Sequence, residues 1–437
     1  MLTAKRSIPV LLLCALLAAC TPLWFSGSAD TSTQAADASP LTCPLEITSN
    51  ANCQTPHSLR VAYGVESLMQ HGYTGKGQTV VDIVSFGSPT LQQDMDIFDQ
   101  TFGLPPITIK VLAPLGTKPF NFADKNMTGW VGETELDVQI IHAIAPGANI
   151  VVLTSPVSET EGTIGLPEFL KLEQYAVNNH LGSIISQSWG ASEVTLKDSA
   201  GQQEVHSWDS FFKQATTKQG ITFFASSGDN GATDYTDLNA TTLSPTPTTS
   251  FPTDDPWVTS VGGTRLKRAG SGTSPANYRF VETGWSMSGG GFSAFFPTPS
   301  YQQMLPSNVQ KELNHRRGVP DVAADADPHT GLAIYVGGWE LGGGTSASAP
   351  LWAAITAIAN QMAGHSLGFI NSALYKLAAS STSAQDFHNI TVGNNTTVVD
   401  GKFVQGYSAA KGWDPITGLG SPNAEKLLPD LIVALRV

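Results

Sequence analysis

The chain has 437 residues, of which 41% are hydrophobic and 14% are charged. Soluble domains usually have about 25% charged residues, so this composition argues against a mainly disordered chain. The 23 basic and 36 acidic residues give a formal net charge of −13, which argues against a phosphate-binding basic surface and against nucleic acid as a partner.

The first residues have the pattern of an export signal. Lys5 and Arg6 precede an apolar run, residues 8–19, which has the length of a signal-peptide core and is too short to span a bilayer. The run ends in Leu17-Ala18-Ala19-Cys20, which resembles the bacterial lipobox. We therefore expect residues 1–19 to be a signal peptide, and the protein to be secreted or held at the cell surface by a lipid on Cys20. An ordinary signal peptide with a chance cysteine is the alternative.

Residues 20–55 are predicted to form a tether. From Thr21 to Pro40 the chain is rich in Ser, Thr, Ala and Asp, which is typical of a solvated linker. Cys43 and Cys53 are the two cysteines outside the leader, and in an oxidising compartment they are candidates for a local disulfide. Residues 56–437 are predicted to be the main domain.

In the main domain, short apolar runs alternate with helical patterns. Five runs are predicted to be strands buried on both faces: 79–86, 149–154, 183–188, 221–227 and 332–336. Five segments with apolar residues three and four apart are predicted to be helices: 133–144, 167–179, 205–219, 346–362 and 371–379. The alternation predicts an α/β fold with a doubly wound, mostly parallel sheet, helices on both faces, and a functional site at the carboxyl ends of its strands.

A glycine-rich loop leads directly into one of these helices. The string is LGGGTSASAP, residues 341–350, and it places Ser346 in the first turn of the helix. Unpaired N–H groups and the positive end of the helix dipole favour negative charge there, which suits a nucleophile that attacks a carbonyl. The alternative is that Thr345 or Ser346 only caps the helix.

Two further strings carry paired or turn carboxylates. In GETELDVQIIHAIAPGA, residues 132–148, Glu133 and Asp137 are four apart and share a helix face at the edge of an apolar stripe, so they should share a proton. A solvated acidic helix start is the alternative. In FFASSGDNG, residues 223–231, Asp229 follows a buried strand, where a turn Asp that bonds its own backbone is the alternative. Asp82, in the first strand, is predicted to be a buried structural residue.

Together, the three motifs resemble those of the sedolisin family, the serine-carboxyl peptidases of the subtilisin clan. The resemblance extends from about Leu59 to Asn423 and includes SQSWG at Ser186 and RGVPDVAADADP at Arg317. It implies a subtilisin-like α/β fold and a secreted, acid-active peptidase whose substrates are proteins or peptides.

The resemblance also implies a role for each catalytic candidate. Ser346 would attack the peptide carbonyl, Glu133 would act as general base, and Asp137 would orient Glu133 and share its proton. A neutral Asp229 would donate a hydrogen bond to the oxyanion.

FHNIT at Phe387 and GWDPITGLGSP at Gly412 resemble the calcium loop of the family. The resemblance implies one structural calcium ion, bound through oxygen ligands. Its ligands would be Asn389, the carbonyls of Ile390, Ala410 and Gly412, and the Asp414 carboxylate. The family usually has Asp at the position of Asn389, so this site has one charge fewer.

Two other interpretations stay open. The first is a catalytically silent surface binding protein on the same fold, which is favoured by the weakened calcium loop and by the short segment before residue 58, where the family has a long prodomain. The second is a neutral subtilisin-like enzyme that uses one of the nine histidines, although none is followed by Gly-Thr on a helix. We expect a monomer, and the sequence leaves endopeptidase and tripeptidyl peptidase as alternatives.

Overall fold

The computed structural model describes residues 42–47, 52–269 and 279–436, which all belong to one compact unit. The predicted signal peptide 1–19, Cys20 and the tether up to residue 41 lie outside the described residues. Cys43 is disulfide-bonded to Cys53. No helix among the described residues has the length and apolarity of a membrane span.

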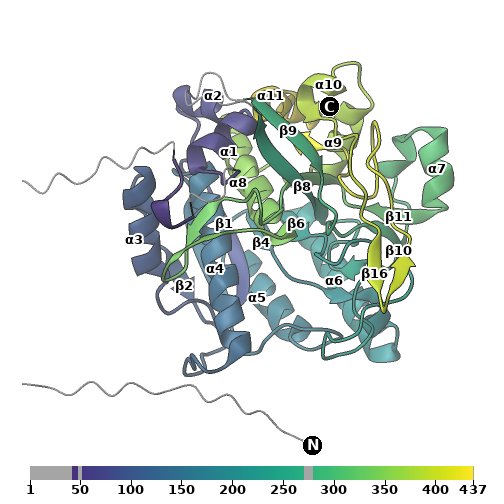
Figure 1. The fold of residues 1–437 in the computed structure, drawn as a ribbon, viewed down its shortest axis with the longest axis horizontal. Helices are drawn as coiled ribbons and strands as arrows, with labels where there is room; N and C mark the ends of the chain where they lie inside the picture. The colour runs from purple at the N-terminus through teal and green to yellow at the C-terminus, as the bar shows by residue number, and fades with distance from the viewer. Residues whose placement is uncertain (1–41, 48–51, 270–278, 437) are drawn as a thin grey trace, which may run out of the picture. The chain divides into compact units, whose positions relative to one another are not determined.

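An eight-stranded sheet forms the centre of the unit (Figure 1). Seven strands lie in the order β12-β8-β6-β4-β1-β3-β2 and pair in parallel, whereas β9 pairs antiparallel with β8. The strands are β1 Thr79–Ser85, β2 Lys110–Leu112, β3 Asn149–Ser155, β4 Ile184–Gln187, β6 Thr222–Ser226, β8 Thr259–Ala269, β9 Arg279–Gly284 and β12 Val322–Asp325.

Helices cover both faces of this sheet, as the doubly wound prediction requires. The long ones are α4 Lys125–Ile144, α5 Leu166–Asn178, α6 Ser199–Gln219 and α8 Thr345–Ala363. Helices α4 and α8 share one hydrophobic core and α5 and α6 share another. Strand β1 separates the two cores, because Val80 and Val84 belong to the first and Val81 and Ile83 to the second.

Shorter elements surround the sheet. The remaining helices are η1 Leu45–Ile47, α1 Pro56–Ala62, α2 Val65–Gln70, α3 Leu91–Phe102, η2 Glu193–Leu196, η4 Gln302–Met304, α7 Ser307–Leu313, α9 Asn371–Ala378, α10 Ser383–Asp386 and α11 Ala424–Ala434. Two-stranded antiparallel sheets pair β5 Ala191–Ser192 with β7 Ser250–Phe251, β10 Gly291–Pro297 with β11 Arg316–Val319, β13 Ala333–Tyr335 with β14 Trp339–Leu341, β15 Phe387–His388 with β18 Ser421–Pro422, and β16 Thr397–Val399 with β17 Lys402–Val404.

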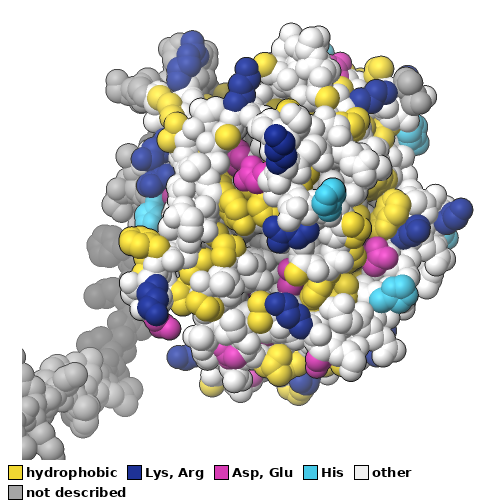
Figure 2. Space-filling view, turned by 90° about the vertical axis from the view of Figure 1, so that its right-hand side faces the viewer, with side chains coloured by type: hydrophobic (Ala, Val, Ile, Leu, Met, Phe, Trp, Pro, Cys, Tyr) yellow, Lys and Arg dark blue, Asp and Glu magenta, His cyan; other side chains and the backbone are white. Residues whose placement is uncertain are grey.

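On the face that Figure 2 shows, Lys and Arg side chains are scattered among hydrophobic and acidic ones.

Four of the five predicted strands are confirmed in the central sheet, and the five predicted helices are present. The prediction for 332–336 as a strand of this sheet is wrong, because β13 pairs only with β14. Its apolar residues are buried against α3 and α4, so burial there comes from helix packing and not from the sheet. The helix predicted at 133–144 begins earlier, at Lys125, where the Asp124 side chain accepts hydrogen bonds from the N–H groups of Asn126 and Met127.

Strands β8 and β12 were not predicted, because their small residues give little strand signal. Gly262 and Gly263 interrupt β8, and two alanines stand in the centre of β12. A Cβ at Gly263 would lie 2.7 Å from the Ala326 Cβ and 2.8 Å from the Trp285 ring, so this part of the sheet is packed too tightly for side chains.

Candidate active site

The nucleophile candidate lies where the sequence places it, in the first turn of α8. This helix begins at Thr345 after the N-cap Gly344, and Ser346 is half-buried. Gly344 has a φ of +85°, and a Cβ on it would lie 2.5 Å from the Asp229 carboxylate. Glycine is therefore needed at position 344 for both its backbone conformation and its lack of a side chain.

Helix α4 packs directly against α8 and carries Glu133 to Ser346. Burial raises the pKa of Glu133 to about 8. The negative charges of Asp229 and Asp82 also raise this pKa, whereas the hydrogen bond with the Ser346 hydroxyl lowers it. A half-buried carboxyl in contact with a serine hydroxyl at a helix N-terminus has the geometry of a general base beside its nucleophile.

Asp137 lies one helical turn further along α4 and is fully buried. The Ser188 hydroxyl donates to Asp137 Oδ1 at 2.9 Å and also lies 3.2 Å from the Ser346 carbonyl oxygen, so Ser188 connects α4 to α8. Burial raises the pKa of Asp137 well above its ordinary value, and the charges of Asp82 and Glu133 raise it further.

Asp82 is a residue of this site that the sequence analysis assigned only a structural role. It is fully buried on β1, on the face covered by α4 and α8, and its carboxyl is close enough to that of Asp137 for each to change the pKa of the other. Burial raises its pKa to about 7. A carboxyl in the middle of a strand predicted to be buried on both faces must have a polar partner, and this signal could have identified it. We call Glu133, Asp137 and Asp82 the carboxyl cluster.

The carboxyl cluster is held without a counter-charge. The interactions acting on its three members come from other carboxyls, from hydroxyls and from the backbone N–H of Ile83. Like charges this close cannot all be ionised, so the cluster must retain protons to stay buried.

Asp229 follows β6 and lies against the start of α8. Its Oδ1 accepts hydrogen bonds from the Thr345 N–H at 2.7 Å and from the Thr345 hydroxyl at 2.9 Å. The Asp229 side chain reaches the surface. Partial removal of the carboxyl from water by the surrounding protein still raises its pKa, whereas the two hydrogen bonds from Thr345 lower it. Since Oδ1 is the oxygen that accepts these bonds, Oδ2 is the oxygen available to carry a proton.

Within the described ranges, the contacts of Ser346 are with Glu133 and Ser188, and none is with a histidine. His142, which is also in α4, is fully buried and lies 3.2 Å from Asp99 Oδ1 and 2.9 Å from the Pro105 carbonyl oxygen. Glu133 occupies the position beside the nucleophile that a histidine base would need.

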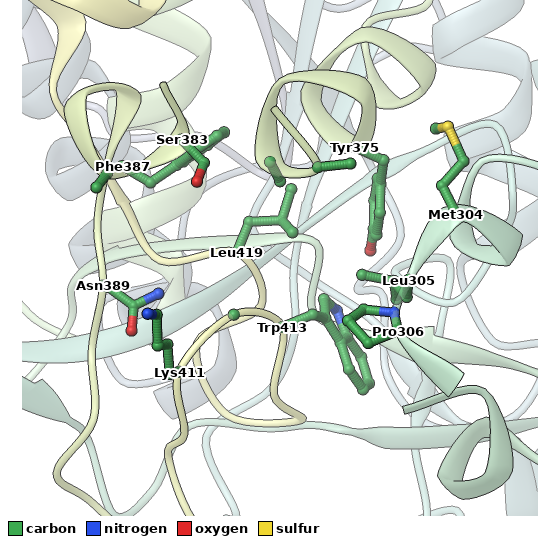
Figure 3. A pocket seen from close by; sticks show the side chains of 14 residues that line it. Met304, Leu305, Pro306, Tyr375, Ser383, Phe387, Asn389, Lys411, Trp413 and Leu419 are labelled. Atoms are coloured by element: carbon green, nitrogen blue, oxygen red, sulfur yellow. The ribbon is translucent and has the colours of Figure 1, made fainter. Parts of the chain in front are cut away.

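The predicted calcium ligands do not fit a metal ion in this arrangement. Asp414 supplies the one carboxylate of the set, and its two oxygens accept four bonds, from the N–H groups of Ala410, Ile416 and Thr417 and from the Thr417 hydroxyl, at 2.9–3.1 Å. Asn389 and Lys411 point into the same pocket of about 420 Å³, shown in Figure 3. A saturated carboxylate and a neighbouring ammonium group oppose cation binding. Asp414 thus closes this loop through four hydrogen bonds from protein groups.

Comparison with known proteins places the chain in a family. The model of the subtilase family matches residues 124–400. Kumamolisin of Bacillus sp. (strain MN-32) is 34% identical over 372 residues, which cover 83% of this chain and 61% of kumamolisin. Tripeptidyl-peptidase 1 of Rattus norvegicus is 29% identical over 86% of this chain and 64% of its own length. The chain thus spans less than two thirds of the length of either relative.

A solved structure agrees with these sequence relatives. Pseudomonas sedolisin, a serine-carboxyl proteinase solved in complex with two molecules of pseudo-iodotyrostatin, superposes with a TM-score of 0.69 at 27% identity and covers 86% of this chain and 97% of that structure. The central parallel sheet with helices on both faces is accordingly a subtilisin-like fold. The chain belongs to the subtilase family, in its sedolisin group.

Proposed function

We propose that the protein is a secreted, acid-active serine-carboxyl peptidase that hydrolyses peptide bonds in proteins or peptides. The observation that carries this proposal is the contact between the Ser346 hydroxyl, at the N-terminus of α8, and the Glu133 carboxyl, backed by Asp137. Membership of the sedolisin group supports it. Export through residues 1–19 and a lipid on Cys20 remain predictions from the sequence.

The proposed reaction begins from the form in which Asp137 and Asp82 hold the protons of the carboxyl cluster and Glu133 is ionised, so that Glu133 can take the proton of Ser346. Ser346 Oγ attacks the peptide carbonyl carbon, Glu133 then gives its proton to the leaving amine, and a water molecule hydrolyses the resulting ester with Glu133 again as base. Asp137 fixes the orientation of Glu133 and shares its proton, and Asp82 shares the proton of Asp137.

The tetrahedral intermediate needs donors for its oxyanion. The N–H of Ser346, in the first turn of α8, is one, and Asp229 is the other if it is protonated. A neutral carboxyl can donate where a carboxylate cannot, so the raised pKa of Asp229 favours catalysis on the acid side of neutrality.

A second buried acid pair also supports operation in acid. Ser293 Oγ lies 2.6 Å from both Glu193 Oε1 and Asp254 Oδ2. One hydroxyl has one proton and can donate to only one of these oxygens, so a carboxyl of the pair must donate the other bond. Burial raises the pKa of Asp254 well above its ordinary value, and the Glu193 charge adds to this. The native structure therefore holds a proton between these two side chains.

The first prediction concerns the nucleophile. Replacing Ser346 by Ala should lower the rate of hydrolysis of denatured protein between pH 2 and 8 by about 10⁴-fold or more, because Ser346 supplies the one hydroxyl that acts on Glu133 in the part of the chain that the structure describes. Ser348→Ala is the matched control, since the Ser348 hydroxyl donates only to the Thr345 carbonyl inside the same helix. Full activity of a folded Ser346→Ala variant in acid would overturn the proposal.

The second prediction concerns the alkaline limb of the pH profile. In the wild type, kcat/KM should fall as the pH rises through the raised pKa of Asp229, because the oxyanion loses a donor. Asp229→Asn keeps an N–H donor at every pH, so we expect its alkaline limb to move up by about one pH unit or more. Asp96→Asn, an exposed change on α3, should leave the limb in place. An unchanged limb in Asp229→Asn would exclude Asp229 as the limiting group.

The third prediction concerns stability. The folded-state pKa of Asp254 is raised, so its contribution to stability is present in acid and is lost as the pH rises above about 4 and through the folded pKa. Asp254→Asn replaces the carboxyl proton by a permanent amide donor. Over this range, the difference in free energy of unfolding between Asp254→Asn and the wild type should shift in favour of the variant by up to about 1.4 kcal/mol for each pH unit.

Urea unfolding at pH 4, 6 and 8 measures this difference. The exposed Asp400→Asn variant serves as the control, and its difference from the wild type should not change with pH. A constant difference between Asp254→Asn and the wild type from pH 4 to 8 would mean that the pair holds no proton in the native state.

The fourth prediction concerns calcium. Because Asp414 is saturated by four protein donors, addition of EGTA should shift the Tm by less than about 2 °C, and millimolar calcium should not raise it. A fall in Tm on chelation that calcium reverses would show that this loop binds the ion after all.

A further inference from the structure

A cavity opens directly beside the proposed general base. It has a volume of about 320 Å³, within the range of small-ligand sites. Its lining includes Glu133, the chain segment Ser188–Gly190 that follows β4, and side chains from the start of α4. A peptide whose scissile carbonyl reaches Ser346 must therefore place neighbouring side chains in or next to this cavity.

Glu159 lies in the wall of this cavity and has an unused carboxyl oxygen. The side chain is only 7% exposed, and its Oε1 has no hydrogen-bond partner. Its backbone N–H donates to Ser85 Oγ at 3.0 Å, and a Cβ on Gly165 would lie 2.5 Å from the Glu159 Cα, so the loop is fixed on both sides. A buried carboxyl held in place without a partner is costly unless a ligand supplies that partner.

The neighbouring acids are already engaged. Glu161 accepts hydrogen bonds from the Ser192 N–H at 2.8 Å and the Thr195 hydroxyl at 3.0 Å. Asp234 accepts bonds from Ser250, Asn230 and the Tyr235 N–H. Both still act on Glu159 through their charge, so they add negative potential without competing for a ligand.

The other charged groups around the cavity are Glu133 and Lys125. Lys125 is exposed at the start of α4, and among the described residues no ion pair links it to Glu159. The walls also include the rings of Trp130 and Trp189, which offer apolar surface to an alkyl chain. The cavity thus combines apolar walls with a free carboxyl at a fixed position.

We propose that Glu159 binds the ammonium or guanidinium group of a Lys or Arg side chain next to the scissile bond of the substrate, which makes basic peptides the preferred substrate class. This inference rests on the proposed peptidase function. A carboxylate paired with a cation regains the hydrogen bonds that burial denies it, and a neutral side chain of the same length leaves it unpaired.

The preference should depend on pH. Burial, followed by the charges of Glu161 and Asp234, raises the pKa of Glu159 well above its ordinary value, so the empty site holds a proton. Binding of a cation releases this proton to solvent. The preference for Lys and Arg should therefore increase as the pH rises towards neutrality.

The experiment has two stages. Mass spectrometry of the fragments that the wild type releases from a denatured protein mixture should show Lys or Arg enriched at one fixed position near the cleaved bond. Two quenched peptides that differ only by Lys or norleucine at that position then give a ratio of kcat/KM. We expect a ratio of about tenfold or more in the wild type, and a fall to about threefold or less in Glu159→Gln.

Three controls keep the outcomes separate. Glu168→Gln makes the same change on α5 outside the cavity lining and should keep the wild-type ratio. Lys125→Gln removes the cation at the rim and should not lower the ratio. Thermal unfolding shows whether each variant is folded. An unchanged ratio in folded Glu159→Gln, or no enrichment of basic residues by the wild type, overturns the inference.

The proposed function is tested separately in the same assay. Cleavage of the norleucine peptide that is absent in Ser346→Ala supports the peptidase even if the ratio shows no preference for Lys. Absence of cleavage of both peptides by the folded wild type removes the proposed function, and this inference with it.

Discussion

The packing of α4 against α8 is the contact on which the rest of the site depends. Both helices lie over the same face of the sheet, and α8 is rich in alanine at buried positions, which lets a neighbouring helix come close. The contact sets a carboxyl on one helix against a hydroxyl in the first turn of the other. Strand β1 lies below them and supplies Asp82, so the sheet itself closes the back of the carboxyl cluster.

Several buried carboxyls in the described part of this protein have no counter-ion, so they must keep protons in the native state. Salt bridges could hold such groups in their ionised form, but here hydroxyls, backbone N–H groups and other carboxyls surround the carboxyl cluster. The pair of Glu193 and Asp254 shows the same arrangement away from the nucleophile, with Ser293 between them. Protons therefore act as structural components, and their retention depends on the pH of the surroundings.

The sequence predicted the parts of the site that are set by local structure. Ser346 at a helix start, Glu133 and Asp137 on one helix face, and Asp229 after a buried strand each follow from short-range spacing, which the structure reproduces. The fold class followed in the same way from alternating strand and helix patterns.

Contacts between distant segments could not be read from the sequence. Asp82 and Asp137 are 55 positions apart, and only the packing of α4 on β1 brings them together. The Ser85 hydroxyl that holds the Glu159 backbone and the Ser293 hydroxyl beside Asp254 likewise come from other elements, so neither acid has a local pattern that distinguishes it from a surface acid. Strands β8 and β12 were missed because the tight packing of the sheet selects glycine and alanine there, and these residues carry little strand propensity.

The proton shared by Glu193 and Asp254 also affects the range of pH in which the folded protein is stable. Through Ser293, the pair joins three parts of the chain: η2 with Glu193, the residues that follow β7 with Asp254, and β10 with Ser293. Elements η2 and β7 lie next to Ser188–Gly190, which form one wall of the proposed substrate cavity. The pKa values of Asp254 and Asp229 are both raised, so a rise in pH would remove a proton from the pair next to this wall and from the proposed oxyanion donor. For the proposed peptidase, one change in pH would thus act on both the fold and the catalytic donor, without an inhibitor.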